Sequence, residues 1–297
     1  MAFENWDEIR TAFQVARVGT VSGAAEMLGV HHATVIRHID ALETRLGAKL
    51  FQRHARGYTP TEAGQELLTV AQTTEDKFSQ LAARIAGTGT EISGELVVTS
   101  LAGLSRLVTP TLVQMGRDHP GIRLRYITDA RVYRLEYGEA HVAIRAGDKP
   151  QDPDYVVQPL ITKQVALYAS RGYIAEHGQP GDETDFAGHM FIGPEGDSAR
   201  APYNRWLLAH VPAENIALGS NDPVFTQEAA VAGAGLAFLP ILDGRSEPDL
   251  VEVIGPRDDW GVPLWLVTHV DLHRTPKIQA FLTALKHSAK ACQGAQG

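Results

Sequence analysis

The stretch of sequence that decides the fold runs from residue 20 to residue 64 and reads TVSGAAEMLGVHHATVIRHIDALETRLGAKLFQRHARGYTPTEAG. A short apolar segment ends at Gly29, where a tight turn needs a residue with positive φ. A second, amphipathic segment begins near His32, and apolar residues spaced by 4, 3 and 4 predict that it is a helix with one buried face. These residues are Val35, Ile39, Leu42 and Leu46. Because residues 49–58 predict a short strand and a glycine-containing hairpin, the order is that of a winged helix-turn-helix, which lays one helix in the major groove of DNA.

The outer face of the second helix carries the candidate base contacts. In a helix-turn-helix the N-terminal part of this helix touches base edges, so Ala33, Thr34 and Arg37 are the expected readers. Arg37 can donate two hydrogen bonds to a guanine, and Thr34 or Ala33 can contact the methyl group of a thymine. His38 and Arg45 lie outside the apolar stripe, so we expect both on the outer face, with His38 among the DNA contacts.

The wing carries the candidate phosphate contacts. Arg53 and Arg56 are expected to bind the DNA backbone, which gives affinity without sequence information. One arginine alone would favour a merely solvated surface, but two in the wing together with Arg37 favour DNA. The chain has a formal charge of −8. Residues 27–58 nevertheless hold five Lys and Arg against two acidic residues, so the positive footprint is local.

These residues resemble the LysR-type transcriptional regulators of bacteria. The resemblance is carried by AAEMLGV, by the spacing across residues 35–43, by Leu50-Phe51 with Arg53, by Arg56-Gly57 and by Thr61-Glu62-Ala63-Gly64. The chain departs from the family at His31-His32, where Ser-Gln is usual, at Ile36, where a small polar residue is frequent, and at Asp40, where a basic one is frequent. The two histidines could also bind a metal ion, but adjacent residues on a helix point about 100° apart.

A long helical stretch follows from Thr61. Apolar and small residues recur in it at spacings of 4, 3, 4, 3 and 4, which predicts a heptad seam that pairs with a second copy. The seam consists of Leu67, Ala71, Thr74, Phe78, Leu81 and Ile85, and Leu67, Phe78, Leu81 and Ile85 are the candidate dimerisation residues. The alternative is a helix that packs onto its own domain. Residues 87–90 (Gly-Thr-Gly-Thr) then predict a hinge.

From residue 94 the pattern changes to alternating strands and helices, which predicts a mostly parallel sheet covered by helices. Strands are expected at 95–100, 122–128, 142–145, 165–169, 191–193, 216–220, 236–239 and 264–269, and helices at 104–118, 132–138, from 170 onward, 203–210, 223–232 and 276–289. The fold class is α/β with an N-terminal winged helix-turn-helix.

This region also resembles the LysR effector module, which is similar to periplasmic solute-binding domains. The resemblance rests on Leu135 and Gly138 with the run 142–147, and on AGAGLAFLP at 232–240, while His141 stands where the family commonly has Asp. It implies two lobes joined by two crossover strands, with a small-molecule cleft between them. The expected domains are a DNA-binding domain (1–60), a linker helix and hinge (61–90) and an effector domain (91–297), whose lobe I holds 91–160 and 267–297 and lobe II holds 161–266.

The general rule for ligand binding in α/β sheets also predicts a ligand in this cleft. In open α/β sheets, ligands bind beyond the carboxyl ends of strands and beside helix N-termini. Ser100 ends the first strand, so its hydroxyl and the next amides predict a carboxylate cradle, although a plain helix cap would look identical. Arg145 could face the cleft or bridge the lobes. The six candidate effector contacts are Ser100, Ala102, Thr128, Arg145, Asn221 and Phe225.

Other features bound the function. We expect a cytoplasmic chain, because it has no signal peptide or membrane-spanning stretch and its one cysteine, Cys292, allows no intramolecular disulfide. No catalytic motif of the kinds GxSxG or HExxH occurs, so an enzyme is not expected. The alternation His269, Asp271, His273 could ligate a metal, but a strand end explains it as well, so no metal and no cofactor are expected.

The resemblance to this family implies a LysR-type regulator. A homodimer or homotetramer is expected to bind an interrupted palindromic operator in double-stranded DNA. A small organic effector is expected between the lobes, and an anion is favoured. RNA polymerase is a further candidate partner. The alternative is a small-molecule-binding protein or enzyme with a vestigial helix-turn-helix.

Overall fold

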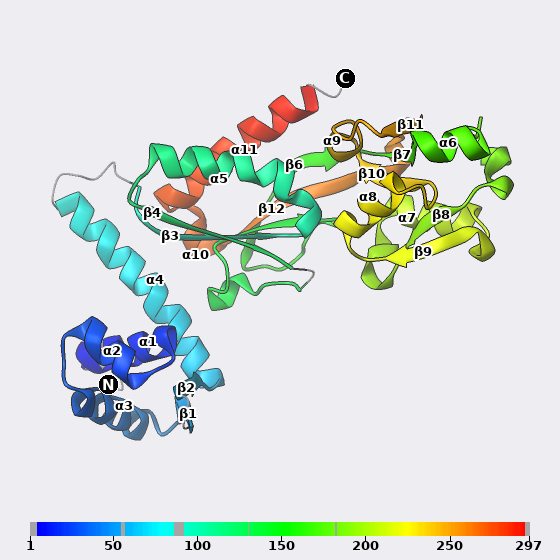
Figure 1. The fold of residues 1–297 in the computed structure, drawn as a ribbon. Helices are drawn as coiled ribbons and strands as arrows, with labels where there is room; N and C mark the ends of the chain where they lie inside the picture. The colour runs from blue at the N-terminus through cyan, green and yellow to red at the C-terminus, as the bar shows by residue number, and fades with distance from the viewer. Residues whose placement is uncertain (1–4, 55–56, 86–91, 130, 182, 295–297) are drawn as a thin grey trace. The chain divides into compact units, whose positions relative to one another are not determined.

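The computed structural model describes residues 5–54, 57–85, 92–129, 131–181 and 183–294. The chain divides into two compact units. Figure 1 colours the whole chain from blue at the N-terminus to red at the C-terminus. The first holds Met1–Val97, His119–Arg123 and Tyr133–His141, and the second holds Val98–Asp118, Leu124–Val132 and Val142–Gly297. Among the described residues, no helix is long and apolar enough to cross a membrane.

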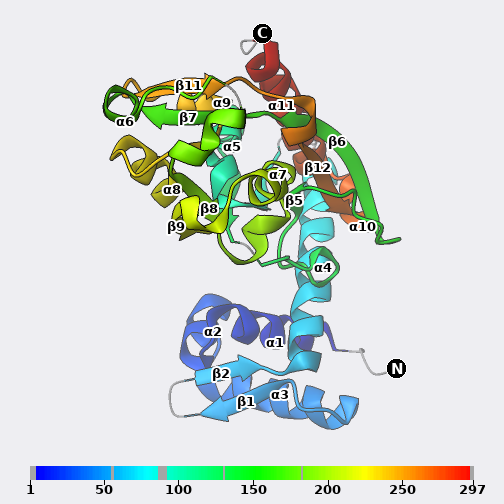
Figure 2. The ribbon, with the colours of Figure 1, turned by 90° about the vertical axis from the view of Figure 1, so that its right-hand side faces the viewer.

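The N-terminal part of the first unit is a winged helix-turn-helix followed by a long helix. Its elements are α1 (Trp6–Val18), α2 (Val21–Leu28), α3 (His32–Leu46), β1 (Phe51–His54), β2 (Gly57–Pro60) and α4 (Glu62–Ile85). Strands β1 and β2 pair antiparallel, and Figure 2 shows this hairpin beside α3. Gly29 ends α2 with φ 65°, as the turn required. The predicted stripe of α3 is confirmed at Val35, Ile39 and Leu42, which are buried against α1 and α2, whereas Leu46 is only partly buried.

The start of α4 is fixed by two residues of the Thr61–Gly64 motif. The Thr61 hydroxyl donates to the Lys49 carbonyl at 2.6 Å and accepts from the Gly64 amide at 3.2 Å. A side chain at Gly64 would place its Cβ 2.0 Å from the Leu50 carbonyl oxygen, so only glycine fits there. The motif therefore joins α4 to the chain that leads into the wing.

Lobe I of the effector domain is built on a five-stranded sheet. Its order is β4-β3-β5-β12-β6, from strands β3 (Gly94–Ser100), β4 (Ile122–Thr128), β5 (Val142–Ala146), β6 (Tyr155–Lys163) and β12 (Val262–His269). Strands β3 and β5 are parallel, whereas β12 is antiparallel to β5 and β6. Helices α5 (Ser105–Asp118) and α11 (Pro276–Gly294) lie side by side along this sheet (Figure 1), and the short helices η1 (Ala102–Leu104), η2 (Leu135–Tyr137) and α10 (Val270–His273) complete the lobe.

Lobe II contains two smaller sheets. The first has the order β10-β7-β11 and is antiparallel, and the second pairs β8 with β9 in parallel. Their bounds are β7 (Val165–Ser170), β8 (Phe191–Pro194), β9 (Ile216–Ser220), β10 (Ala237–Pro240) and β11 (Leu250–Ile254), and the helices are α6 (Arg171–His177), η3 (Glu183–Gly188), η4 (Gly196–Arg200), α7 (Pro202–His210), η5 (Ala213–Asn215), α8 (Pro223–Val231), α9 (Ile241–Gly244) and η6 (Asp258–Trp260). Aromatic rings fill the core, with Phe186, Phe191 and Trp260 fully buried.

Three expectations about this half are corrected. The sheets are not mostly parallel, because β12 returns antiparallel into lobe I and both pairings of the β10-β7-β11 sheet are antiparallel. Strands β6 and β11 were not anticipated, and Pro159 within β6 obscures its pattern. The helix expected at 132–138 is only the three-residue turn η2.

The strands also locate the passage between the lobes. β6 passes into β7 with Gln164 alone between them, and β11 leads to β12 through residues 255–261. These crossings lie a few residues inside the interval of 161–266 expected for lobe II, because β6 continues to Lys163 and β12 starts at Val262.

Candidate functional site

The N-terminal half of α3 presents an open surface. Ala33 and Arg37 are exposed, and Thr34 is half-buried beside them. Within the described part of the chain, no hydrogen bond or ion pair engages the Arg37 guanidinium. These three residues therefore stand where a helix-turn-helix touches bases.

The flank of α3 that faces α1 is different, and the outward orientation expected for His38 and Arg45 is wrong. His38 Nδ1 lies 2.9 Å from the Thr11 hydroxyl of α1. Arg45 forms an ion pair with Glu8 of α1, whose side chain is 9% exposed. Helix α1 covers the flank of α3 as well as its apolar stripe, so polar residues on that flank bind α1.

Glu43 anchors the wing to α3. Its side chain is 1% exposed, and its oxygens accept from the amides of Leu50 (3.0 Å) and Phe51 (3.3 Å) and from Lys49 Nζ (2.7 Å). Burial would raise the pKa of Glu43, but the hydrogen bonds from Lys49, Leu50 and Phe51, with the charge of Arg53, lower that pKa below its ordinary value. An ionised carboxylate thus fixes the chain between α3 and β1.

Arg53 completes this network instead of standing free. Its Nη2 donates to Asp40 at 2.6 Å and to Glu43 at 3.0 Å, and its guanidinium lies 5.4 Å from the centre of the Tyr58 ring. The hydrogen bond to Asp40 raises the pKa of Arg53. The Arg53 side chain as a whole keeps 34% exposure. Arg56, the other wing candidate, lies outside the described residues.

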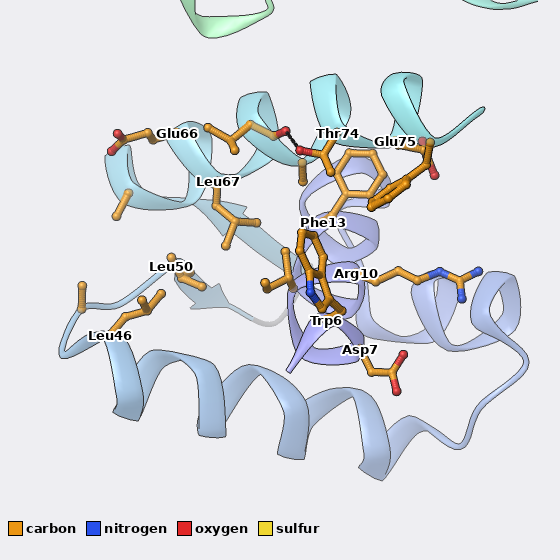
Figure 3. A pocket seen from close by; sticks show the side chains of 16 residues that line it. Trp6, Asp7, Arg10, Phe13, Leu46, Leu50, Glu66, Leu67, Thr74 and Glu75 are labelled. Carbon is orange, nitrogen blue, oxygen red and sulfur yellow. Dashed lines mark hydrogen bonds between the residues drawn. The ribbon is translucent and has the colours of Figure 1, made fainter. Parts of the chain in front are cut away.

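A wide apolar groove runs between α1 and α4, with a volume of about 970 Å³. We call it the α1–α4 groove. Figure 3 shows Trp6, Phe13 and Leu67 pointing into it, and Val70 and Phe78 also line it. Trp6 and Phe78 meet edge to face with ring centroids 5.9 Å apart, yet they stay 59% and 56% exposed. Such exposure of large apolar side chains marks a surface that another molecule covers.

The candidate dimerisation residues divide around this groove. Leu67 and Phe78 line it, whereas Leu81 lies outside its lining and is 42% exposed. Ile85 is the last residue of α4, and its side chain lies outside what the structure describes. The seam therefore packs partly on its own α1 and is partly open.

The expected cradle at Ser100 is already hydrogen-bonded. Ser100 is buried, and its hydroxyl lies 2.6 Å from the Tyr126 hydroxyl and donates to the Leu101 carbonyl at 2.9 Å. Ala102, the first residue of η1, and Thr128, the last residue of β4, are both exposed. Sequence reasoning missed Tyr126, although it shares a strand face with Thr128 two residues later.

The opposing lobe brings Asn221 and Phe225 to the same region. Both are exposed at the start of α8, which Asp222 caps by accepting from the Val224 amide at 2.9 Å. A side chain at Gly103 would meet Pro223, the first residue of α8, at 3.6 Å. The two lobes therefore approach each other where η1 faces the N-terminus of α8.

Arg145 and the histidine pattern near 270 have local roles. The Arg145 guanidinium lies 5.0 Å from the centre of the Tyr155 ring, within lobe I. His269 caps α10 by accepting from the Asp271 amide at 3.3 Å, and His273 Nδ1 lies 2.9 Å from the Thr268 hydroxyl. These contacts account for the alternation as the end of a strand and the start of a helix.

A winged helix-turn-helix joined to a two-lobed α/β domain defines a transcription factor of the ligand-responsive kind. Two family models match the chain, the bacterial regulatory helix-turn-helix protein of the lysR family over residues 6–65 and the LysR substrate binding domain over residues 89–290. The chain belongs to the LysR family and is a LysR-type transcriptional regulator with a DNA-binding and an effector-binding domain.

Named relatives agree with this assignment. The chain is 27% identical over 270 residues to the HTH-type transcriptional regulator DmlR of Escherichia coli, covering 86% of this chain and 87% of that protein. It is 28% identical over 252 residues to the HTH-type transcriptional activator IlvY of Salmonella typhimurium, covering 81% and 84%. These relatives do not favour the alternative of an enzyme or simple binding protein.

Solved structures share the fold. ArgP from Mycobacterium tuberculosis superposes with a TM-score of 0.70 at 19% identity, covering 96% of this chain and 97% of that one. CrgA from Neisseria meningitidis gives 0.58 at 20% identity, covering 96% and 99%.

Proposed function

We propose that this regulator binds an interrupted palindromic operator in double-stranded DNA through the N-terminal half of α3. The observation that carries the proposal is the open surface formed by Ala33, Thr34 and Arg37. Arg37 supplies two parallel donors for a guanine, and Thr34 or Ala33 supplies a methyl-sized apolar contact. The wing adds contacts to the DNA backbone, and the partial exposure of the Arg53 side chain supports that role.

The proposed active form is a homodimer, or a homotetramer built from dimers. The α1–α4 groove supports it, because its exposed Trp6 and Phe78 rings need an apolar cover and a heptad seam offers one from a second copy. Two copies then present two α3 helices, which is what a palindrome requires. In this proposal the chain works in the cytoplasm, with RNA polymerase as the further partner of the DNA-bound form.

The proposed signal is a small organic effector bound between the lobes, without any other cofactor. The approach of η1 to the start of α8 supports this location, with Ala102, Thr128, Asn221 and Phe225 exposed around it. The exposed side-chain amide of Asn221 offers a polar contact, and Phe225 favours an apolar part of the same molecule. Effector and operator then influence each other reciprocally.

Footprint titration of the full-length chain tests the DNA assignment. Arg37→Ala should weaken operator binding by about 1–3 kcal/mol and binding to scrambled DNA much less. Arg117→Ala is the matched control, because it removes an exposed arginine from α5 in the effector domain. Equal losses on both DNAs would make Arg37 a phosphate contact and overturn the proposed base readout.

A thermal-shift screen of small metabolites tests the effector assignment. A ligand at about 100 times its Kd adds about 2.7 kcal/mol to the stability of the domain that binds it. A hit should lose affinity when Asn221 or Phe225 is replaced by alanine. A hit that both variants bind as tightly as the parent does would place the effector elsewhere.

A further inference from the structure

The passage between the lobes is short. Only Gln164 separates β6 of lobe I from β7 of lobe II, and the Gln164 carbonyl accepts from the Ile241 amide at 3.2 Å. Helix α9, which begins at Ile241, is thereby fixed at the point where the chain changes lobes. Any rotation of one lobe against the other changes the surroundings of α9.

Three charged side chains meet at this crossing. Arg106 of α5 in lobe I places its Nε 2.9 Å from Asp243 Oδ1 of α9, and its Nη1 donates to the Leu242 carbonyl at 3.4 Å. Lys163, the last residue of β6, lines the same small cavity as Arg106 and Asp243. One carboxylate of lobe II thus pairs with the Arg106 guanidinium of lobe I and shares this cavity with the lysine at the crossing.

Burial and the neighbouring charges act in opposite directions on the pKa values of Asp243 and Lys163. Asp243 is 21% exposed, whereas Arg106 is 54% exposed. Burial raises the pKa of Asp243, and the charges of Arg106 and Lys163 oppose this rise. Burial lowers the pKa of Lys163, and the charge of Asp243 opposes that fall. A partly buried carboxylate that loses its cations is costly, so separation of the lobes at this point is unfavourable.

The space between these groups is small. The cavity that Lys163, Arg106 and Asp243 line together has a volume of about 40 Å³, and its other lining residues come from both lobes and include Leu104 and Ile241. A cavity of this size holds water and not an organic molecule. The three charged groups therefore serve each other instead of a bound metabolite.

We propose that Arg106, Lys163 and Asp243 form an electrostatic latch that holds the two lobes in one arrangement across the β6–β7 crossing. The latch draws its strength from a single carboxylate shared by two cations. If Arg106 is lost, Lys163 still compensates Asp243, and the reverse holds as well. Its presence does not depend on which ligand the cleft takes, and only its influence on an effector rests on the proposed function.

Distance measurements between spin labels on the two lobes test the latch. Cys292→Ser removes the only cysteine of the chain, and Arg117→Cys on α5 and Ala175→Cys on α6 provide exposed labelling sites on lobes I and II. The labelled full-length chain is mixed with excess unlabelled chain, so that only distances within one chain are recorded. Without any ligand, the parent should give a single narrow distance peak.

Single and double substitutions should distinguish the contributions of Arg106 and Lys163. Arg106→Gln and Lys163→Met should each broaden the peak slightly, and the double variant should broaden or shift it by more than the two changes combined. Asp243→Asn should match the double variant, and Arg106→Lys should keep the parent's peak. Arg123→Gln is the control, because it removes an exposed ion pair of 3.8 Å with Glu95 away from the crossing.

Salt provides a second test that needs no substitution in the latch. Raising the salt from about 0.05 M to 1 M screens the exposed Arg106 more than the enclosed groups, so the parent's peak should broaden. Additive or absent effects in the variants, with a parent peak that salt leaves unchanged, would overturn the latch. This result would leave the proposed effector site untouched, because the screen for ligands is a separate measurement.

Discussion

Helix α3 of the DNA-binding domain keeps Arg37 open, whereas the Ser100 hydroxyl of the effector domain is already bonded to its neighbours. On α3, Arg37 projects from an exposed surface, and the α1–α4 groove leaves Trp6 and Phe78 more than half exposed. In the cleft region of the effector domain, the Ser100 hydroxyl is buried against Tyr126. A surface that waits for a large rigid partner can keep its groups solvated, but a narrow cleft must satisfy its polar groups internally until a ligand replaces the bonds.

The largest effect is expected at the open groove. Phe78→Asp should dissociate the dimer, because a charge would be buried against a second copy. Since two linked half-site contacts become one, operator affinity should fall by about 10²-fold or more. Sedimentation and gel shifts measure the two effects. Lys77→Asp is the control, since it puts the same charge one residue away and outside the groove lining. If Phe78→Asp still sediments as a dimer, the groove is not the interface.

The next effect concerns Glu43, the carboxylate that anchors the wing to α3. Glu43→Gln should lower the free energy of opening between α3 and the wing by about 2–3 kcal/mol, because it weakens hydrogen bonds to a charged acceptor. Hydrogen exchange at the Leu50 and Phe51 amides measures this locally. Glu26→Gln, an exposed carboxylate on α2, is the control. Unchanged protection of both amides would show that the anchor contributes nothing.

The same anchor gives a pH dependence of known sign. The pKa of Glu43 is lower in the folded state than its ordinary value, so its contribution is complete above about pH 4.5 and disappears as the pH falls through the lowered pKa. The difference in amide protection between Glu43→Gln and the parent should therefore shrink on acidification. A difference that persists at low pH would contradict an ionised anchor.

A smaller effect is expected where the effector domain is internally bonded. Ser100→Ala should weaken binding of the identified effector about five-fold, as expected for one net hydrogen bond, and should leave operator affinity without effector nearly unchanged. Tyr126→Phe should act alike, because the two hydroxyls form one pair. Thr109→Ala, at an exposed position of α5, is the control for calorimetry. If both variants bind effector as the parent does, the pair is purely structural and the pocket lies elsewhere.

The sequence predicted features that depend on local geometry. The period of α3 and the turn at Gly29 each follow from neighbours in the chain, and the structure confirms both. The exposure of Arg37 follows as well, because it lies opposite the buried stripe of its own helix.

Features that depend on distant segments were not predictable in this way. His38 turns toward Thr11, 27 residues earlier in the chain, and Arg53 binds two carboxylates of a neighbouring helix. The period of one helix does not reveal which flank a second helix covers. The sequence did not predict the contacts of Tyr126 and Asp243 for the same reason, since their partners come from segments that meet only in the folded chain.

The smallest effect tests whether the bonded pair at the wing limits DNA binding. Asp40 is half exposed on α3 and accepts from Arg53 at 2.6 Å, while Glu43 holds the same guanidinium at 3.0 Å. Asp40→Asn should change stability little, because an exposed ion pair contributes about 0–1 kcal/mol. It should raise affinity for operator and scrambled DNA alike by a few-fold, because it removes a negative charge from the DNA-facing helix and leaves Arg53 freer to bind phosphate. The slope of log K against log salt should steepen by up to about one. Gel shifts over a salt series measure the slope, with Asp118→Asn at the end of α5 as the control for a lost surface charge.

Arg53→Ala should have the opposite effect on the salt dependence and flatten the slope of log K against log salt by about one on every sequence. If both variants keep the parent's slope, neither side chain faces the DNA backbone, and the wing of this regulator binds through other residues.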